Sequence, residues 1–469
     1  AGNTAMGCGA LTTNTTGTNN VAVGCGALLS NTTGCCNTAI GRNALDANTT
    51  ANHNTAVGMS SLGANTTGTA NTALGKDSLA TNSTGGNNVA VGNCALAVNT
   101  ASNNTAVGTS ALIANTTGTC NVAVGDNALK TQTTATDNTA IGHDTLCSIT
   151  SSAGGNTAVG NKVMQKNTTG YYNASVGSLA MCCNTTGHSN ATLGYKSLAA
   201  NTTGVCNVAV GQTALLTATT ASYNTAVGMR AMLLTTTGNK NVAVGTSAMQ
   251  CNTTGSKNTA VGGMDTNAFP TMFANTTGSN NTAIGNSTLM CNTTASNNVA
   301  VGKEALKLNT TGCRNVAVGS LALDSNTTAC GNTAVGYRGL DANTTGAENT
   351  AVGKGAMTNN TTGQQNTAVG ANVMLCNTTG QYNSAFGFQA MNRNTDSEGN
   401  TGIGYQSLYT NTTGDANTAV GRDALVSSTT ASNNTAVGKD SLKANTTATA
   451  NTGVGALSLD AATSGSYNT

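Results

Sequence analysis

The sequence predicts an all-β protein, a parallel β-solenoid (β-roll) of about 27 coils with a 17-residue repeat. Three observations predict it. The pentad Asn-Thr-Ala-Val-Gly, or a close variant, opens 27 successive segments of the 469-residue chain. The segments are rich in Asn, Thr and Gly, which favour short strands and bends over helix. Only 7% of the residues are charged and 3% are aromatic, so ordinary globular cores would lack large apolar side chains.

The repeat keeps its phase from Asn3 to Asn451. Of the 26 spacings between successive opening Asn residues, 23 are 17 residues long, and the exceptions are 16, 18 and 23 residues. The consensus is N-T-A-V-G-x-x-A-L-x-x-N-T-T-G-x-x, numbered as repeat positions 1 to 17. Asn at position 1 and Gly at position 5 recur in all 27 repeats. We therefore expect a single continuous array over residues 1–469 rather than several domains.

Each repeat is expected to form two or three short strands. Thr-Ala-Val at positions 2 to 4 suits a strand, Gly at position 5 suits a bend, and Asn-Thr-Thr-Gly at positions 12 to 15 suits a further strand and bend. Asn at position 1 should form an amide ladder along the stacked coils.

The apolar positions predict which side chains face inward. Because neighbours in a strand face opposite ways, we expect Val at position 4 and Leu at position 9 inside, with Ala facing outward. Small outward side chains would let another backbone approach closely. This favours lateral association, most simply a homotrimer, and the alternative is that exposed Ala is merely tolerated.

Composition and motifs narrow the function classes. The net charge of +2 gives no electrostatic case for nucleic acid or anionic lipid. No apolar run approaches the roughly 18 residues that a membrane span needs. His53, His143 and His188 lie in distant repeats, neither His-Glu-x-x-His nor Cys-x-x-Cys occurs, and the acidic residues are too scattered for a calcium-binding repeat. We therefore predict no cofactor, no metal site and no catalytic set, and an enzyme is the least supported class.

Asn at position 12 opens an N-glycosylation sequon in 19 repeats. One interpretation is a glycan-coated extracellular fibre. The other is that Asn-Thr-Thr-Gly is the turn chemistry that the coil requires, which produces sequons without any glycan. The candidate acceptors are Asn14, Asn31, Asn48, Asn65, Asn82, Asn115, Asn167, Asn184, Asn201, Asn252, Asn275, Asn292, Asn309, Asn326, Asn343, Asn360, Asn377, Asn411 and Asn445.

Two pairs of Cys residues share a repeat position in consecutive repeats, Cys8 with Cys25 and Cys313 with Cys330. Coils stacked roughly 4.8 Å apart would place their Cα atoms inside the window of about 4.4–6.8 Å that a disulfide needs. Each pair could therefore form a disulfide between coils. The alternative is that Cys substitutes freely at bends, as Ser does, and the odd total of 15 Cys supports it.

The 23-residue repeat over residues 258–280 carries six extra residues and the one Pro of the chain. One interpretation is an exposed binding loop on a regular scaffold. The other is a drifted repeat whose Phe side chains cover a local gap. The residues of this candidate loop are Asn267, Phe269, Pro270 and Phe273.

The repeat resembles those of two groups of surface proteins. The pentad with Gly at position 5, as at Gly7, Gly24 and Gly41, is similar to the Asn-Ser-Val-Ala-Ile-Gly-type repeats in the head domains of trimeric autotransporter adhesins, whose units are somewhat shorter. The full consensus is similar to the NTAVG…AL…NTTG repeats of tail-fibre-like proteins of phages, viruses and bacteria, and the resemblance extends from Asn3 to Thr469. It implies a left-handed parallel β-roll, trimeric assembly and attachment at a surface.

The expected function is that of a structural, non-catalytic fibre, extracellular or on the surface of a cell or virion, such as an adhesin, a tail-fibre shaft or a filament subunit. Its partners would be copies of itself, as a homotrimer or an end-to-end filament, and a host-surface glycan or receptor. Because the chain begins and ends within a repeat, without capping repeats, we expect a segment of a longer chain or ends that stack on other copies. The alternative function is a ligand-binding solenoid of the ice-binding type, which would use stacked Thr at positions 13 and 14.

Overall fold

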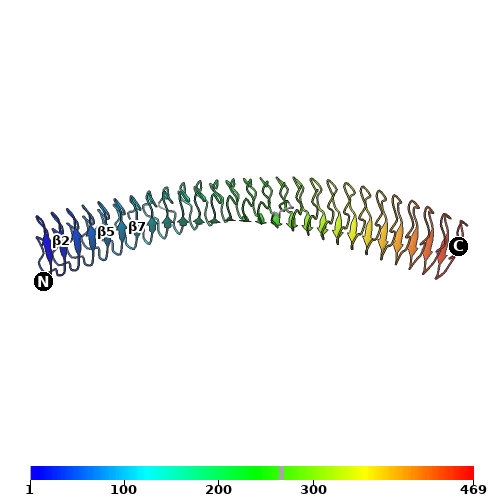
Figure 1. Ribbon diagram of the computed structural model, residues 1–469, viewed down its shortest axis with the longest axis horizontal. Helices are drawn as coiled ribbons and strands as arrows, with labels where there is room; N and C mark the ends of the chain where they lie inside the picture. The colour runs from blue at the N-terminus through cyan, green and yellow to red at the C-terminus, as the bar shows by residue number, and fades with distance from the viewer. Residues whose placement is uncertain (1, 151, 264–268) are drawn as a thin grey trace. The chain divides into compact units, whose positions relative to one another are not determined.

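The structure is a computed structural model that describes residues 2–150, 152–263 and 269–469. The chain divides into two compact units, Ala1–Arg230 and Ala231–Thr469. In each unit every repeat makes one turn of a coil and contributes one strand of three residues (Figure 1). None of the described residues is helical. The predicted all-β solenoid is therefore confirmed.

The strands occupy repeat positions 2 to 4 throughout. Those of the first unit are β1 (Thr4–Met6), β2 (Val21–Val23), β3 (Thr38–Ile40), β4 (Thr55–Val57), β5 (Thr72–Leu74), β6 (Val89–Val91), β7 (Thr105–Val107), β8 (Val122–Val124), β9 (Thr139–Ile141), β10 (Thr157–Val159), β11 (Ala174–Val176), β12 (Ala191–Leu193), β13 (Val208–Val210) and β14 (Thr225–Val227). Those of the second unit are β15 (Val242–Val244), β16 (Thr259–Val261), β17 (Thr282–Ile284), β18 (Val299–Val301), β19 (Val316–Val318), β20 (Thr333–Val335), β21 (Thr350–Val352), β22 (Thr367–Val369), β23 (Ser384–Phe386), β24 (Thr401–Ile403), β25 (Thr418–Val420), β26 (Thr435–Val437) and β27 (Thr452–Val454).

Successive strands within each unit pair in parallel and without a shift of register. Thr38 pairs with Thr55 in the first unit. In the second unit Thr259 pairs with Thr282 across the 23-residue repeat, so the extra residues do not disturb the sheet. The prediction of two or three strands in each coil is wrong, because the described residues at positions 12 to 15 form bends and irregular backbone.

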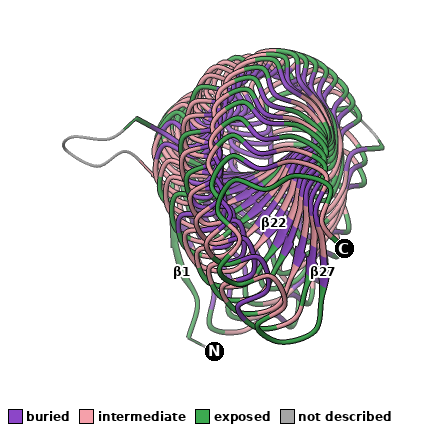
Figure 2. Ribbon diagram, turned by 90° about the vertical axis from the view of Figure 1, so that its right-hand side faces the viewer, coloured by how far each residue is buried: buried purple, intermediate pink, exposed green. Residues whose placement is uncertain are grey.

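The strand side chains face the opposite way to the prediction. Ala56 at position 3 is fully buried, whereas Ile40 and Leu74 at position 4 are 40% and 47% exposed. The space beneath the strand is narrow: a Cβ added at Gly402, also at position 3, would lie 2.8 Å from Cγ of Met391. Position 3 is Ala, Gly, Ser or Thr in every repeat, and the branched aliphatic residues of position 4 face outward while the buried residues line the inside of the coils (Figure 2). The case for lateral association through outward Ala therefore loses its basis.

Position 9 supplies the large core side chains and has an unusual backbone. It is Leu or Met in every repeat, and its φ is always positive, as at Leu28 (50°) and Met374 (45°). Branching at Cβ makes this left-handed conformation unfavourable, which accounts for the lack of Val and Ile at this position. The left-handed residue also interrupts strand-like alternation, so Ala27 and Leu28 are both fully buried although they are adjacent.

The predicted amide ladder at position 1 is confirmed. The backbone N and the side-chain Nδ2 of Asn37 both donate to Oδ1 of Asn20, at 2.9 and 3.2 Å. Nδ2 of Asn20 donates in turn to the carbonyl oxygen of Gly34 at 2.8 Å. These side chains are fully buried, and their hydrogen bonds tie each coil to the next as well as to its own turn.

Candidate functional site

The Asn residues at position 12 form a second buried ladder. Nδ2 of Asn48 donates to Oδ1 of Asn31 in the preceding coil, at 2.7 Å, and to the carbonyl oxygen of Ala51 in its own turn, at 3.2 Å. The position 15 carbonyl thus accepts from two Asn side chains, as Gly34 does from Asn20 and Asn31. The two ladders share this acceptor, which is how most of the buried Asn side chains are hydrogen-bonded.

This ladder contains the candidate glycosylation sites. Eighteen of the nineteen Asn residues are 0% exposed, and Asn14, in the first coil, is half-buried. A glycan is carried on Nδ2, the atom that donates the ladder hydrogen bonds, so the folded coil has no room for one at the eighteen buried positions. The alternative interpretation, that Asn-Thr-Thr-Gly is required by the turn, accounts for the observed geometry.

The position 12 ladder is interrupted where Ala, Ser or Ile replaces Asn, whereas Gln132 and Thr235 keep a hydrogen bond to a neighbouring Asn. Ala218 follows Asn201 and Ser428 follows Asn411 in the ladder, and Oδ1 of each of these two Asn residues is buried without a hydrogen-bond partner. Ile149 replaces Asn in the 18-residue repeat and is fully buried. Each interruption costs the interior hydrogen bonds that the neighbouring coils have.

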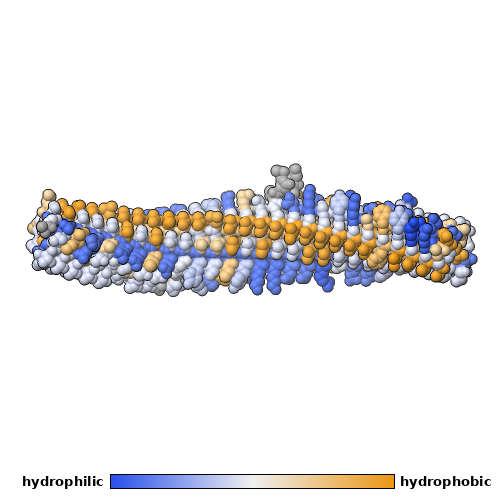
Figure 3. All heavy atoms as spheres, turned by 90° about the horizontal axis from the view of Figure 1, so that it is seen from below, coloured by the Kyte–Doolittle hydropathy of each residue, from blue (hydrophilic) through white to orange (hydrophobic). Residues whose placement is uncertain are grey.

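The outer face of the sheet presents two rows of side chains, at positions 2 and 4. The position 4 row is aliphatic and partly exposed, with Leu193 53% and Ile284 42% exposed. The position 2 row mixes Thr, as at Thr72, with Val, as at Val299. Figure 3, which looks onto the strand side, shows the hydrophobic residues in rows along the coils. The predicted inward direction of the position 4 residues is therefore wrong, and the sequence signal that distinguishes the two rows is β-branching at position 4 and its lack at position 9.

The two Thr rows of the turn differ in their hydrogen bonding. The hydroxyl of Thr32, at position 13, donates to the carbonyl oxygen of Thr49 in the next coil at 3.0 Å. Thr33, at position 14, is exposed. One of the two rows on which an ice-binding face would depend is therefore engaged in holding the coils together.

The two Cys pairs differ. The sulfur atoms of Cys313 and Cys330 lie 2.7 Å apart, and the backbone N of Cys313 donates to the Cys330 sulfur at 2.9 Å. The hydrogen bond from Cys330 lowers the pKa of Cys313, while burial and that same hydrogen bond raise the pKa of Cys330. Cys8 and Cys25 are exposed free thiols, and no hydrogen bond joins their sulfur atoms in the described structure. Of the two predicted pairs, the structure thus brings Cys313 and Cys330 together, and both are free thiols.

The candidate binding loop is only partly exposed. Phe269 is 60% exposed, Phe273 is half-buried and Pro270 is buried. Asn267 lies outside the described residues. Phe269 is part of the coil stacking, because its carbonyl oxygen accepts from the backbone N of Ser287 at 3.1 Å. Of the described candidates, Phe269 is therefore the one that offers a partner most of its side chain.

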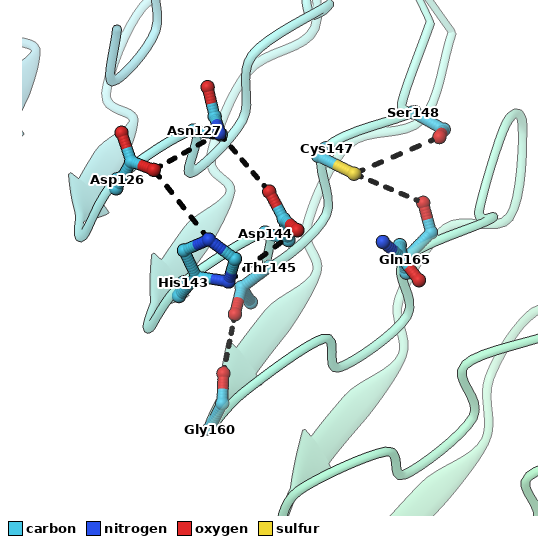
Figure 4. Close-up of polar contacts among 9 residues, drawn as sticks. All are labelled: Asp126, Asn127, His143, Asp144, Thr145, Cys147, Ser148, Gly160 and Gln165. Atoms are coloured by element: carbon cyan, nitrogen blue, oxygen red, sulfur yellow. Dashed lines mark hydrogen bonds and ion pairs between the residues drawn. The ribbon is translucent and has the colours of Figure 1, made fainter. Parts of the chain in front are cut away.

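His143 lies between two carboxylates at the turn that follows β9 (Figure 4). Its Nε2 is 3.6 Å from Oδ2 of Asp126, and its Nδ1 is 3.5 Å from Oδ2 of Asp144. The hydroxyl of Thr145 donates instead to the carbonyl oxygen of Gly160, and the thiol of Cys147 to that of Gln165. His143 and Asp126 are each about half exposed, so the cluster is a solvated set of surface side chains, and the nearby hydroxyl and thiol are held by other partners.

Two further findings concern the described residues. They contain no group of three or more His, Cys, Asp or Glu side chains that could hold a metal ion. They also contain no helix with the length and apolar character to cross a membrane.

Comparison with known proteins adds no further constraint on function. No family model matches the chain, and no curated protein matches it.

Proposed function

We propose that the chain is a structural, non-catalytic fibre segment of an extracellular assembly or of a cell or virion surface, built to associate with copies of itself. The observation that carries this proposal is that the polar side chains of the interior form hydrogen bonds from one coil to the next. In the second unit, nine successive position 12 hydrogen bonds run from Asn252 to Asn411 without a break. An unbroken run of hydrogen bonds between coils is what a stiff structural fibre requires.

The outer face supports self-association. A second copy carries the same rows of position 2 and position 4 side chains at the same 17-residue interval, so contacts made by one coil can be repeated by the next. Regular rows of partly exposed aliphatic side chains along a sheet are also the kind of surface that marks an interaction site. The proposed association surface is therefore this face, in place of the outward Ala side chains that the sequence predicted.

Light scattering and electron microscopy of the purified chain test the proposal. We expect trimers or filaments. The triple variant Ile284→Lys, Val301→Lys and Val318→Lys charges the position 4 row and should yield monomers. The matched control charges the exposed position 14 row of the same coils, through Thr294→Lys, Thr311→Lys and Thr328→Lys. A monomeric wild type, or equal behaviour of the two triple variants, would contradict association through this face.

The alternative function, an ice-binding solenoid, is ranked second because the position 13 hydroxyls are engaged within the protein. Thermal hysteresis in a solution of the purified chain would support it. A freezing point equal to the melting point, together with filaments in micrographs, would reject the ice-binding function and leave the structural fibre as the remaining hypothesis.

A further inference from the structure

A gap in one row of side chains forms a cavity in the first unit. Thr136, Gly154, Tyr171 and His188 all occupy position 16, in four consecutive coils. Their equivalence is shown by the backbone: the carbonyl oxygens of Thr136, Gly154 and Tyr171 each accept from the position 17 nitrogen of the next coil, at 3.2, 3.2 and 3.0 Å. Gly154 therefore leaves one place in the row without a side chain.

One wall of the gap is an aromatic face. The rings of Tyr171 and His188 are stacked, with centroids 4.5 Å apart and an interplanar angle of 9°. Because the two residues stack from coil to coil, the ring face of Tyr171 opposite His188 looks toward the place that Gly154 leaves empty. The Tyr171–His188 pair also shows that one coil spacing holds one ring.

The other walls are a second Tyr and a polar edge. Tyr172 lies against Gly155, where an added Cβ would be 2.6 Å from its ring, and stands at 81° to Tyr171. Across the gap are Thr136 and Asp137, whose side chains share a hydrogen bond of 3.1 Å. Together with Ser152 these groups line an open cavity of about 390 Å³.

We propose that this cavity binds a neutral pyranose ring of a carbohydrate. Thr136 and Tyr171 are two coil steps apart, roughly 10 Å, which leaves the thickness of one ring between them. The C–H face of a pyranose packs against an aromatic face, whose quadrupole is negative. The Asp137 carboxylate and the Thr136 hydroxyl accept hydrogen bonds from sugar hydroxyls, and the carboxylate charge disfavours acidic sugars.

The same gap occurs elsewhere without the aromatic wall. Gly86 also occupies position 16, but the equivalent residues on either side are Thr69 and Ser102, and the backbone N of Gly86 donates to the Ser102 hydroxyl at 3.0 Å. Gly86 therefore serves as an internal control for the contribution of Tyr171. The inference does not rest on the proposed fibre function, because the cavity needs only the local coils.

Saturation-transfer NMR on the full chain tests the proposal, with the methyl pyranosides of glucose, galactose, mannose and N-acetylglucosamine as probes. At least one sugar should bind saturably. Gly154→Tyr fills the gap without removing any lining side chain, and Tyr171→Thr installs the residue found at Thr136. Each should weaken binding by on the order of tenfold or more. Gly86→Tyr should leave binding unchanged, and circular dichroism verifies that each variant is folded.

The proposal is overturned if none of the four sugars binds, or if Gly154→Tyr binds as the wild type does. It is also overturned if choline or phenol, tested in the same way, binds in place of the sugars. A chain that binds sugar yet forms no trimers or filaments would reject the fibre and retain this site.

Discussion

Two stretches of the position 12 row behave differently. In the second unit, the row from Asn252 to Asn411 is unbroken, with distances from 2.7 to 3.3 Å. In the first unit, Gln132 makes a longer hydrogen bond of 3.4 Å to Asn115, and Ile149 follows it. The coil that contains Ile149 also has an extra residue and carries Gly154, at the floor of the cavity.

The difference shows what regularity provides in a solenoid. Identical side chains in successive coils satisfy one another, so each coil gains hydrogen bonds that an isolated coil would lack. A coil that departs from the consensus, such as the coil with Ile149, loses these interior hydrogen bonds. Its outer side chains then do not continue the rows formed by the neighbouring coils. In this chain the 18-residue coil of the first unit is where a ring-sized cavity opens.

Breaking the regular stretch should have the largest effect. Asn343→Ala removes two donated hydrogen bonds, of 3.1 Å to Asn326 and 3.0 Å to Gly346, and one accepted from Asn360 at 2.8 Å. We expect the free energy of local opening to fall by about 4 kcal/mol, since an acceptor is also left unpaired in the interior. Amide hydrogen exchange in the adjacent coils measures it.

The control in the same coil is Thr345→Ala, at the exposed position 14. Equal exchange rates in the two variants would show that the ladder does not stabilise the coil.

Oxidation of Cys313 and Cys330 should strengthen the regular stretch. The two thiols would lose two protons and two electrons to a small-molecule disulfide such as oxidised glutathione, which is reduced to two thiols. A covalent link that closes a 17-residue loop should stabilise the folded coils by about 3 kcal/mol. Mass spectrometry of peptides and denaturation with and without reductant measure the two effects. A link between Cys8 and Cys25 formed in preference would contradict the geometry, and Cys330→Ser is the control.

Replacing Leu306 tests the left-handed backbone at position 9, where φ is 50°. Leu306→Val should destabilise the coil by about 2 kcal/mol, because a β-branched side chain is disfavoured at this positive φ and a methylene is lost from the core. Leu306→Met should be nearly neutral, because Met occupies the same position at Met357. Thermal unfolding followed by circular dichroism separates the two variants. Equal midpoints would mean that branching at Cβ does not matter there.

Repairing the ladder should have the smallest effect. Ser428→Asn would give Oδ1 of Asn411 a donor and would offer Nδ2 of Asn445 an acceptor. We expect a gain of about 1 kcal/mol, the usual net value of one hydrogen bond. Slower amide exchange in the coils on both sides of Ser428 would confirm it, whereas an unchanged rate would show that the unpaired oxygen costs little.

The candidate site was less predictable than the fold. Sequon spacing marked the Asn of position 12 but could not show that Nδ2 faces the interior. Repeat phase paired Cys8 with Cys25 as readily as Cys313 with Cys330, since both pairs share a position in consecutive repeats. The sulfur atoms meet only in the second pair, at 2.7 Å. The gap at Gly154 had a sequence signal, Gly where neighbouring repeats have Tyr and His, but its aromatic wall depends on how the rings stack.

The sequence by itself determined the fold class, the length of the coil, the strand at positions 2 to 4 and the amide ladder at position 1, because a strict period forces equivalent residues to stack. The tertiary structure alone decided which side chains face inward. Alternation predicts inside and outside only while the backbone stays extended, and the positive φ at position 9 interrupts it. That residue lets Leu lie inside beside Ala, while in the strand the buried Ala of position 3 leaves Val, Ile and Leu of position 4 on the outer face.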